Sequence, residues 1–243
     1  MKKGYDVFSK AYGVMLRNDL HAKDSIDHKL MQEMILLDES SYNLLYQQPP
    51  TIENMENHEV FSYAQQFKSS SDHQTIKNVI KHLCSIASGY NTPFEDMLFG
   101  GTEKEILDRG TDWCSDMARV CTVLLKCLGI PARIVQLANT DKAYNGHAAV
   151  EAYYEGKYGF CDPVYGNCFH KDKPIDVYEI IKDKSILNGM PKDYAGLFSA
   201  AALCDYDPND PNNKYIISRP NDYYLTLIGT SHNDKWIMNE EKQ

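Results

Sequence analysis

The sequence predicts an α+β fold in a single domain that covers residues 1–243. Three observations support this prediction. Apolar residues recur mostly at helical spacing through the first hundred residues. The most strongly patterned helix of the chain then covers residues 112–128, and the pattern changes to short extended segments between residues 133 and 161. Helices that precede and follow a group of consecutive strands are typical of the α+β class.

The N-terminal part, residues 1–101, is expected to be mainly helical. Apolar residues at helical spacing predict helices over residues 12–20, 25–37 and 72–88. Pro49-Pro50 interrupts the chain between the second and third of these helices, because proline cannot continue a helix. We therefore expect a helical extension in front of the central segment.

The central segment, residues 102–170, begins with two predicted helices. Thr102 and Glu105 have the spacing of a capping box, which indicates a short helix that ends near residue 107. Asp112 can cap the start of the next helix, and Gly129 is a suitable residue to end it. The apolar residues of this second helix share one face, so we expect that face to pack on a sheet.

Extended segments follow this helix. Residues 133–137, 147–154 and 158–161 are rich in apolar and aromatic residues and predict three strands. Asn145-Gly146 and Glu155-Gly156-Lys157 provide turns between them. The C-terminal part, residues 171–243, is expected to be mixed. It contains predicted short helices over residues 175–181 and 194–203 and predicted strands over residues 215–218 and 223–228.

The composition excludes some classes of function. A net charge of −9 without a cluster of Lys and Arg argues against nucleic-acid binding, because a phosphate backbone requires clustered positive charge. No run approaches the roughly 20 apolar residues of a membrane-spanning helix. Seven cysteines leave at least one unpaired within the chain, which favours a reducing compartment and so the cytoplasm. If a leader has been removed, a secreted or periplasmic location stays open.

Cys114 is placed at the first turn of the strongest predicted helix. Unpaired backbone N–H groups and the positive end of the helix dipole favour a thiolate there, and the thiolate is the nucleophilic form of cysteine. A nucleophilic cysteine also needs an imidazole as base and a third group to orient that imidazole. His147 begins a predicted strand and Asp162 ends the next one, so an antiparallel hairpin would place the two side by side.

Taken together, these segments resemble the transglutaminase-like superfamily. The resemblance covers residues 102–166 and rests on four blocks, which are GTDWCSDMA at 110–118, LLKCLGIPARIV at 124–135, GHAAVE at 146–151 and FCDPVY at 160–165. It implies a papain-like, transglutaminase-like core in which a Cys-bearing helix packs on an antiparallel sheet that carries the His and the Asp. It also implies that Cys114 is the nucleophile, that His147 is the general base and acid, and that Asp162 orients His147.

Further site residues are less well defined by the sequence. The backbone N–H of Cys114 is a candidate oxyanion donor, and Trp113, Asn91 and Asn78 are candidates for an oxyanion or substrate contact. Cys161, Cys168 and His170 could ligate a metal, but their spacing fits no standard zinc pattern. We therefore expect neither a cofactor nor a metal.

The resemblance and the three residues predict an enzyme that transfers acyl groups through a thioester. We expect a cysteine protease or amidase that acts on a peptide, protein or glycopeptide substrate. Two alternatives remain open. The first is a true transglutaminase, which passes the acyl group of a protein glutamine to an amine. The second is a non-catalytic binding module that retains the fold.

Overall fold

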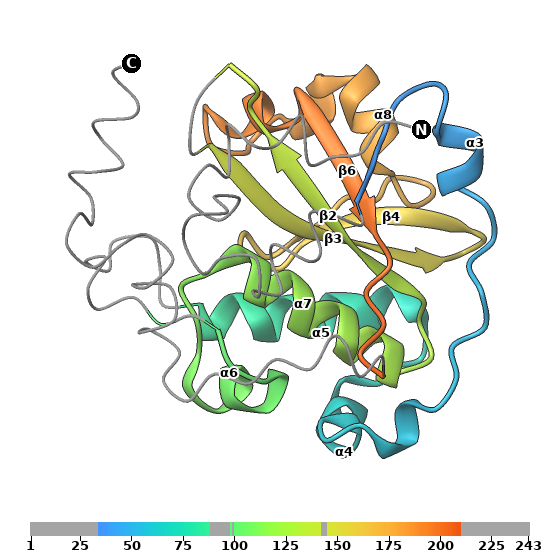
Figure 1. Ribbon diagram of the computed structural model, residues 1–243, viewed down its shortest axis with the longest axis vertical. Coiled ribbons are helices and arrows are strands. Elements are labelled where there is room, and N and C mark those ends of the chain that lie inside the picture. The colour runs from blue at the N-terminus through green and yellow to red at the C-terminus, as the bar shows by residue number, and fades with distance from the viewer. Residues whose placement is uncertain (1–33, 88–97, 99, 142–144, 210–243) are drawn as a thin grey trace, which may run out of the picture.

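A computed structural model describes residues 34–87, 98, 100–141 and 145–209 of the protein. Its centre is a six-stranded sheet in the order β1-β6-β2-β3-β4-β5 (Figure 1). Every pair of neighbouring strands is antiparallel. The strands are β1 (Ile35–Leu36), β2 (Ala132–Ala138), β3 (Gly146–Tyr154), β4 (Lys157–Asp162), β5 (Asn167–Cys168) and β6 (Ala200–Cys204).

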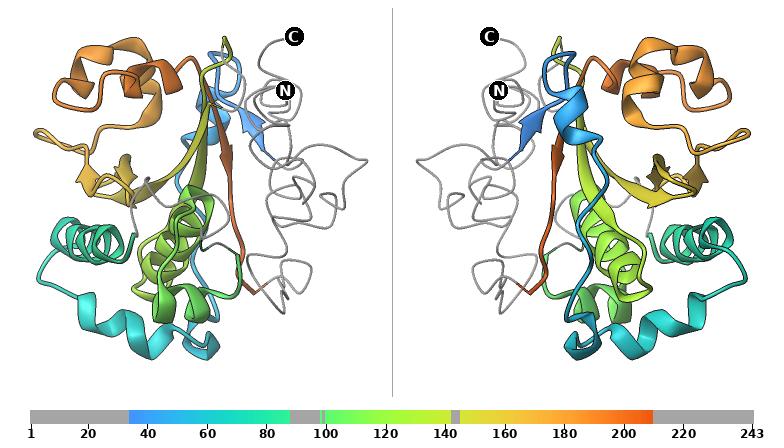
Figure 2. Two further views of the ribbon diagram at one scale, coloured as in Figure 1. Left: turned by 90° about the vertical axis from the view of Figure 1, so that its left-hand side faces the viewer. Right: turned by 90° about the vertical axis from the view of Figure 1, so that its right-hand side faces the viewer.

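Helices lie on both sides of this sheet. The α-helices are α3 (Tyr42–Leu45), α4 (Phe61–Ala64), α5 (Asp72–Ile86), α6 (Glu103–Arg109), α7 (Cys114–Cys127) and α8 (Val177–Lys182). Short 3₁₀ helices are η3 (Met55–Asn57), η4 (Gln65–Phe67), η6 (Lys184–Leu187) and η7 (Tyr194–Leu197). In Figure 1, α5, α6 and α7 lie below the sheet and α8 lies above it, and the side views in Figure 2 keep this order.

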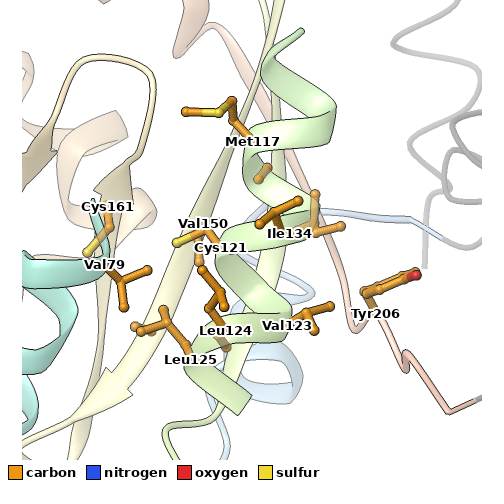
Figure 3. Packing of buried hydrophobic residues seen from close by; sticks show 14 of the residues in the cluster. Val79, Met117, Cys121, Val123, Leu124, Leu125, Ile134, Val150, Cys161 and Tyr206 are labelled. Atoms are coloured by element: carbon orange, nitrogen blue, oxygen red, sulfur yellow. The ribbon is translucent and has the colours of Figure 1, made fainter. Parts of the chain in front are cut away.

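A hydrophobic core fills each face of the sheet. On one face α7 packs on β2 and β3, and α5 packs on α7. Figure 3 shows side chains of α7 among those of Val79 from α5 and of Ile134 and Val150 from the sheet. On the other face, Val135, Leu137 and other residues of the sheet pack against α8, η6 and η7. Because both faces are covered, all seven residues of β2 are buried.

The hairpin of β3 and β4 fixes the register of the two strands. Its turn residues, Glu155 and Gly156, have φ angles of 53° and 78°. Positive φ at both central residues of a two-residue turn matches the right-handed twist of a hairpin, and glycine adopts it without strain. Tyr154 therefore pairs with Lys157, and Val150 pairs with Cys161 further along.

Several predictions from the sequence are confirmed. The strands β2, β3 and β4 and the helices α5, α6, α7 and α8 lie within two residues of their predicted bounds or overlap them closely. The capping box of α6 is present, since Thr102 accepts a hydrogen bond from the backbone N–H of Glu105 and the Glu105 carboxylate accepts one from that of Thr102. Gly129 follows α7 with a φ of 80°, as expected for a residue that ends a helix.

Other predictions are wrong. Residues 200–203, the end of the helix predicted over 194–203, belong to strand β6 between β1 and β2, because this segment is buried on both faces of the sheet. Ile35 and Leu36, at the end of a predicted helix, form β1. Asp112 does not cap α7, whose N-cap residue is Trp113, and the Asp112 carboxylate instead accepts a hydrogen bond from the backbone N–H of Leu98.

The predicted helix over residues 12–20 and the predicted strands over 215–218 and 223–228 lie outside the described residues. Within the described ranges, no helix has the length and apolar character needed to cross a membrane.

Candidate active site

Cys114 is the first residue of α7 and is half-buried. The backbone turns into the helix at Trp113, which has extended φ and ψ angles of −111° and 123°. The buried carboxylate of Asp116, in the first turn of α7, binds the loop that precedes the helix. It accepts hydrogen bonds from the backbone N–H of Gly100 at 2.6 Å and from the hydroxyl of Thr111 at 3.0 Å. The position of the thiol is thus set by the start of a helix and by a loop tied to that helix.

Arg119 fixes the same loop from one turn further along α7. Its guanidinium is buried and lies 2.6 Å from the carboxylate of Glu103 and 2.6 Å from the carbonyl oxygen of Gly101. It also lies 3.6 Å from the carboxylate of Asp116. Two carboxylates and a carbonyl group satisfy a buried positive charge that would otherwise be costly. These contacts join α6, the preceding loop and the Cys-bearing helix into one rigid unit.

His147 lies near the start of β3 and Asp162 at the end of β4, and the two meet at one end of this pair of strands. The Nε2 atom of His147 lies 2.8 Å from Oδ2 of Asp162, and both side chains are buried. Because an ionised carboxylate only accepts hydrogen bonds, Nε2 carries the proton in this contact. The other ring nitrogen, Nδ1, is therefore left for the thiol of Cys114, which interacts with the ring and raises its pKa.

Asp162 is an anion with several donors around it. Its Oδ1 atom accepts hydrogen bonds from the backbone N–H groups of Val164 at 3.0 Å and Tyr165 at 3.2 Å. Its Oδ2 atom accepts from His147 and from the hydroxyl of Tyr194. Burial alone raises the pKa of Asp162, but the charge of His147 and these hydrogen bonds outweigh it and lower the pKa below its usual value.

The pKa of His147 moves in the complementary direction. Burial of the ring lowers it, but the charge of Asp162, the hydrogen bond to Asp162 and the nearby thiol of Cys114 raise it well above 6.5. The protein therefore favours an imidazolium at this position at neutral pH. An imidazolium beside a cysteine stabilises the thiolate, which is the reactive form.

Comparison with known protein families finds a match over the same part of the chain. Residues 62–163 match the family model of the transglutaminase-like superfamily. This part of the chain belongs to the transglutaminase-like superfamily. The matched range contains Cys114 and His147 and ends directly after Asp162.

The chain was also compared with solved structures and with curated protein sequences. The crystal structure of red sea bream transglutaminase aligns with this chain at 16% sequence identity and a TM-score of 0.41. The alignment covers 74% of this chain and 37% of that enzyme, so the chain spans well under half of its length. Among curated protein sequences, none matches this chain.

A pocket with a volume of about 280 Å³ opens at the start of α7, in this transglutaminase-like part of the chain. Cys114 and Trp113 form part of its wall, and Val164 and Tyr165 line it from the segment that follows β4. Cys84 of α5 contributes a second thiol. The Tyr165 ring also meets the ring of His147 edge-on, with centroids 5.8 Å apart. A small substrate group bound here would lie between aromatic side chains and next to the Cys114 thiol.

The remaining residues predicted from the sequence lie in different places. Trp113 adjoins Cys114 in the pocket wall. Asn78 donates to the carbonyl oxygen of Phe67 at 3.1 Å and accepts from Gln74 at 2.9 Å, so its described contacts are to its own helix and the turn before it. Asn91 lies outside the described residues.

Sequence reasoning missed Tyr194, whose hydroxyl donates to the same carboxylate oxygen as His147. Tyr194 is buried in η7, 32 residues beyond Asp162. Its ring packs edge-on against that of Tyr165, with centroids 5.0 Å apart. No local pattern marks it, because its role depends on the packing of η7 against the far face of the sheet.

Proposed function

We propose that this protein is a cysteine hydrolase that cleaves peptide or carboxamide bonds through a thioester on Cys114. The proposal rests on one observation above all. The His147 ring is hydrogen-bonded to Asp162 through Nε2 and interacts with the thiol of Cys114, which lines a pocket at the start of α7. Membership of residues 62–163 in the transglutaminase-like superfamily supports the same chemistry.

In the proposed first step, the Cys114 thiolate attacks the carbonyl carbon of the substrate and forms a C–S bond. The resulting oxyanion can accept hydrogen bonds from the backbone N–H groups that the first turn of α7 leaves outside the helical pattern. The imidazolium of His147 then gives its proton to the leaving nitrogen, and the C–N bond breaks. The products of this step are a free amine and a thioester.

In the second step, neutral His147 takes a proton from water, and the hydroxide attacks the thioester carbon. The C–S bond breaks, and the cysteine leaves as a thiolate beside an imidazolium, as at the start. Asp162 keeps its charge throughout and orients the ring, so no proton has to pass to the carboxylate. Replacement of water by a primary amine in this step would give amine transfer instead.

The test requires no knowledge of the natural substrate. The purified protein is incubated with a peptide library that contains glutamine, and intact protein mass is measured after rapid acid quenching. We expect a protein species with the added mass of an acyl group, and peptide mapping should place this group on Cys114. The products should contain free ammonia or a new peptide end. Cys114→Ala should show neither.

Cys84→Ala is a matched control, because Cys84 lines the same pocket but is hydrogen-bonded to the carbonyl oxygen of Val164. It should retain the acylated species. Hydrolysis that persists in Cys114→Ala would contradict the proposal. Addition of a primary amine then separates the two outcomes of the acyl-enzyme, since a transglutaminase would incorporate the amine in preference to water.

A further inference from the structure

Two histidines and a glutamate meet at the turn of the β3–β4 hairpin, the opposite end of the hairpin from His147 and Asp162. His73 is the second residue of α5, Glu155 lies in the turn between β3 and β4, and His170 follows β5. One ligand atom from each of the three residues lies within 4.8 Å of the other two. Three segments that are distant in the sequence therefore bring three metal-binding side chains together.

The distances suit a single ion. A tetrahedral zinc site has bonds of about 2.0–2.2 Å, which places neighbouring ligand atoms about 3.3–3.6 Å apart. The Nε2 atom of His170 and the Oε2 atom of Glu155 are 3.2 Å apart. The His73 ring stacks on the His170 ring, with centroids 4.2 Å apart, so His73 is close enough to reach the same ion once its ring rotates out of the stack.

The backbone holds two of these residues firmly. Glu155 is one of the two positive-φ residues of the β3–β4 turn, and His170 forms an isolated antiparallel bridge with Pro174. The buried Tyr154 ring lies beneath both histidines, at centroid distances of 5.6 Å from His73 and 6.0 Å from His170. Such support restricts how far the side chains can move apart and favours a preformed site.

We propose that His73, Glu155 and His170 bind a divalent transition-metal ion, of which Zn²⁺ is the best match. The site supplies two imidazole nitrogens and one carboxylate, and water completes the coordination. It ties α5 to the β3–β4 hairpin and to the segment after β5. The proposal is independent of the acyl-transfer chemistry at Cys114, because none of the three ligands belongs to that site.

The ligand set distinguishes between classes of metal ion. Ca²⁺ and Mg²⁺ prefer oxygen ligands, whereas imidazole suits Zn²⁺ and its neighbours in the first transition series.

The experiment titrates the full-length protein with Co²⁺, which replaces Zn²⁺ and has visible absorption bands. We expect one equivalent to give the visible bands of a nitrogen- and oxygen-ligated ion without the intense ultraviolet band of a cobalt–thiolate bond. This distinction matters because the chain has seven cysteines. Zn²⁺ should then displace the Co²⁺ and raise the melting temperature, since it binds only the folded state.

We expect Co²⁺ binding to weaken by more than about tenfold in each of the variants His73→Gln, His170→Gln and Glu155→Gln. Mutation of a residue that only hydrogen-bonds to a metal ligand can already reduce metal affinity by this factor. His82→Gln is the matched control, because His82 lies on the same helix and contacts Tyr63 and Phe67. It should bind Co²⁺ as the native protein does.

Circular dichroism of each variant without metal separates loss of the site from loss of the fold. His73 lies at the start of α5 and is half-buried, so His73→Gln should keep the native spectrum even if His170→Gln does not. The proposal is overturned if the native protein binds no Co²⁺, if binding shows a thiolate band, or if folded His73→Gln binds as tightly as the native protein. In those cases the three residues form only an ion pair with a stacked ring.

Discussion

The Nε2 atom of His147 lies 2.8 Å from Oδ2 of Asp162, although the two residues stand on different strands. The contact exists because the β3–β4 hairpin pairs Val150 with Cys161, so that the strand ends beyond this pair come together. It fixes which ring nitrogen faces the thiol and stabilises the positive charge of the ring. The geometry of the candidate site thus follows from the register of one hairpin.

The first prediction concerns Asp162→Asn. An amide at this position cannot balance the positive charge of His147, so the imidazolium that stabilises the Cys114 thiolate is lost. We expect the rate of alkylation of Cys114 by iodoacetamide at neutral pH to fall markedly, and turnover of any identified substrate to fall at least about a hundredfold. Mass spectrometry of the peptide that contains Cys114 measures the alkylation rate. Asp108→Asn, at an exposed carboxylate paired with Lys104, should leave the rate unchanged.

The second prediction concerns Tyr194→Phe. The change removes one hydrogen-bond donor from the buried Asp162 carboxylate and keeps the ring that packs on Tyr165. Because hydrogen bonds to charged groups contribute about 1.5–3 kcal/mol, the free energy of unfolding should fall by about that amount in a denaturant titration. The pKa of Asp162 should rise, so the acidic limb of the alkylation profile should move to higher pH.

Tyr153→Phe is the control for this change, since Tyr153 lies at the other end of β3 and packs against Tyr158. If Tyr194→Phe and Tyr153→Phe gave the same alkylation profile, Tyr194 would have no role in positioning Asp162.

The third prediction concerns the pH dependence of stability. The pKa of His147 in the folded protein lies well above 6.5, so the folded state holds a proton that the unfolded state releases. The contribution of His147 to stability is fully present below pH 6.5 and is lost as the pH rises through the folded pKa. The difference in unfolding free energy between the native protein and His147→Gln should therefore shrink as the pH is raised above neutral.

His82 should show the opposite dependence of stability on pH, because burial lowers its pKa below 6.5. The difference between the native protein and His82→Gln should grow as the pH rises through this range, since deprotonation then favours the folded state. Equal slopes for the two variants would contradict the assignment of a charged His147.

The fourth prediction concerns Asp176, the N-cap residue of α8. Burial, with a further contribution from Glu151, raises its pKa from 3.8 to about 6, although the Glu179 backbone N–H and Lys157 act in the opposite direction. Between these two values the folded state binds more protons than the unfolded state, so ionisation of Asp176 reduces stability as the pH rises. Asp176→Asn keeps a residue that caps helices well. Its stability relative to the native protein should increase from pH 3.8 to about pH 6 in thermal denaturation.

Asp183→Asn is the control for this prediction, because the hydrogen bonds of Asp183 to Ser185 lower its pKa and the sign is reversed. Relative to the native protein, this variant should lose stability as the pH rises through the titration of Asp183. A relative stability of Asp176→Asn that does not change with pH would show that Asp176 titrates normally.

The sequence predicts the elements of the site well because the signals are local. The capping box at Thr102, the glycine at position 129 and the turn at Glu155-Gly156 each act through residues a few positions away. Non-local contacts give no such signal. Residues 200–204 carry enough apolar side chains to suit a helix, and only their burial between β1 and β2 makes them a strand. Local propensity is a weak guide where packing competes with it.

By itself, the sequence determined that Cys114 lies in the first turn of a helix, that His147 and Asp162 belong to one hairpin, and that residues 102–166 resemble the transglutaminase-like superfamily. Only the tertiary structure decided that Tyr194 donates a hydrogen bond to Asp162 and that the side chains of His73, Glu155 and His170 lie close together. The physical reason is that turns and caps are encoded over a few neighbouring residues. Contacts between distant segments exist only after the two faces of the sheet have been covered.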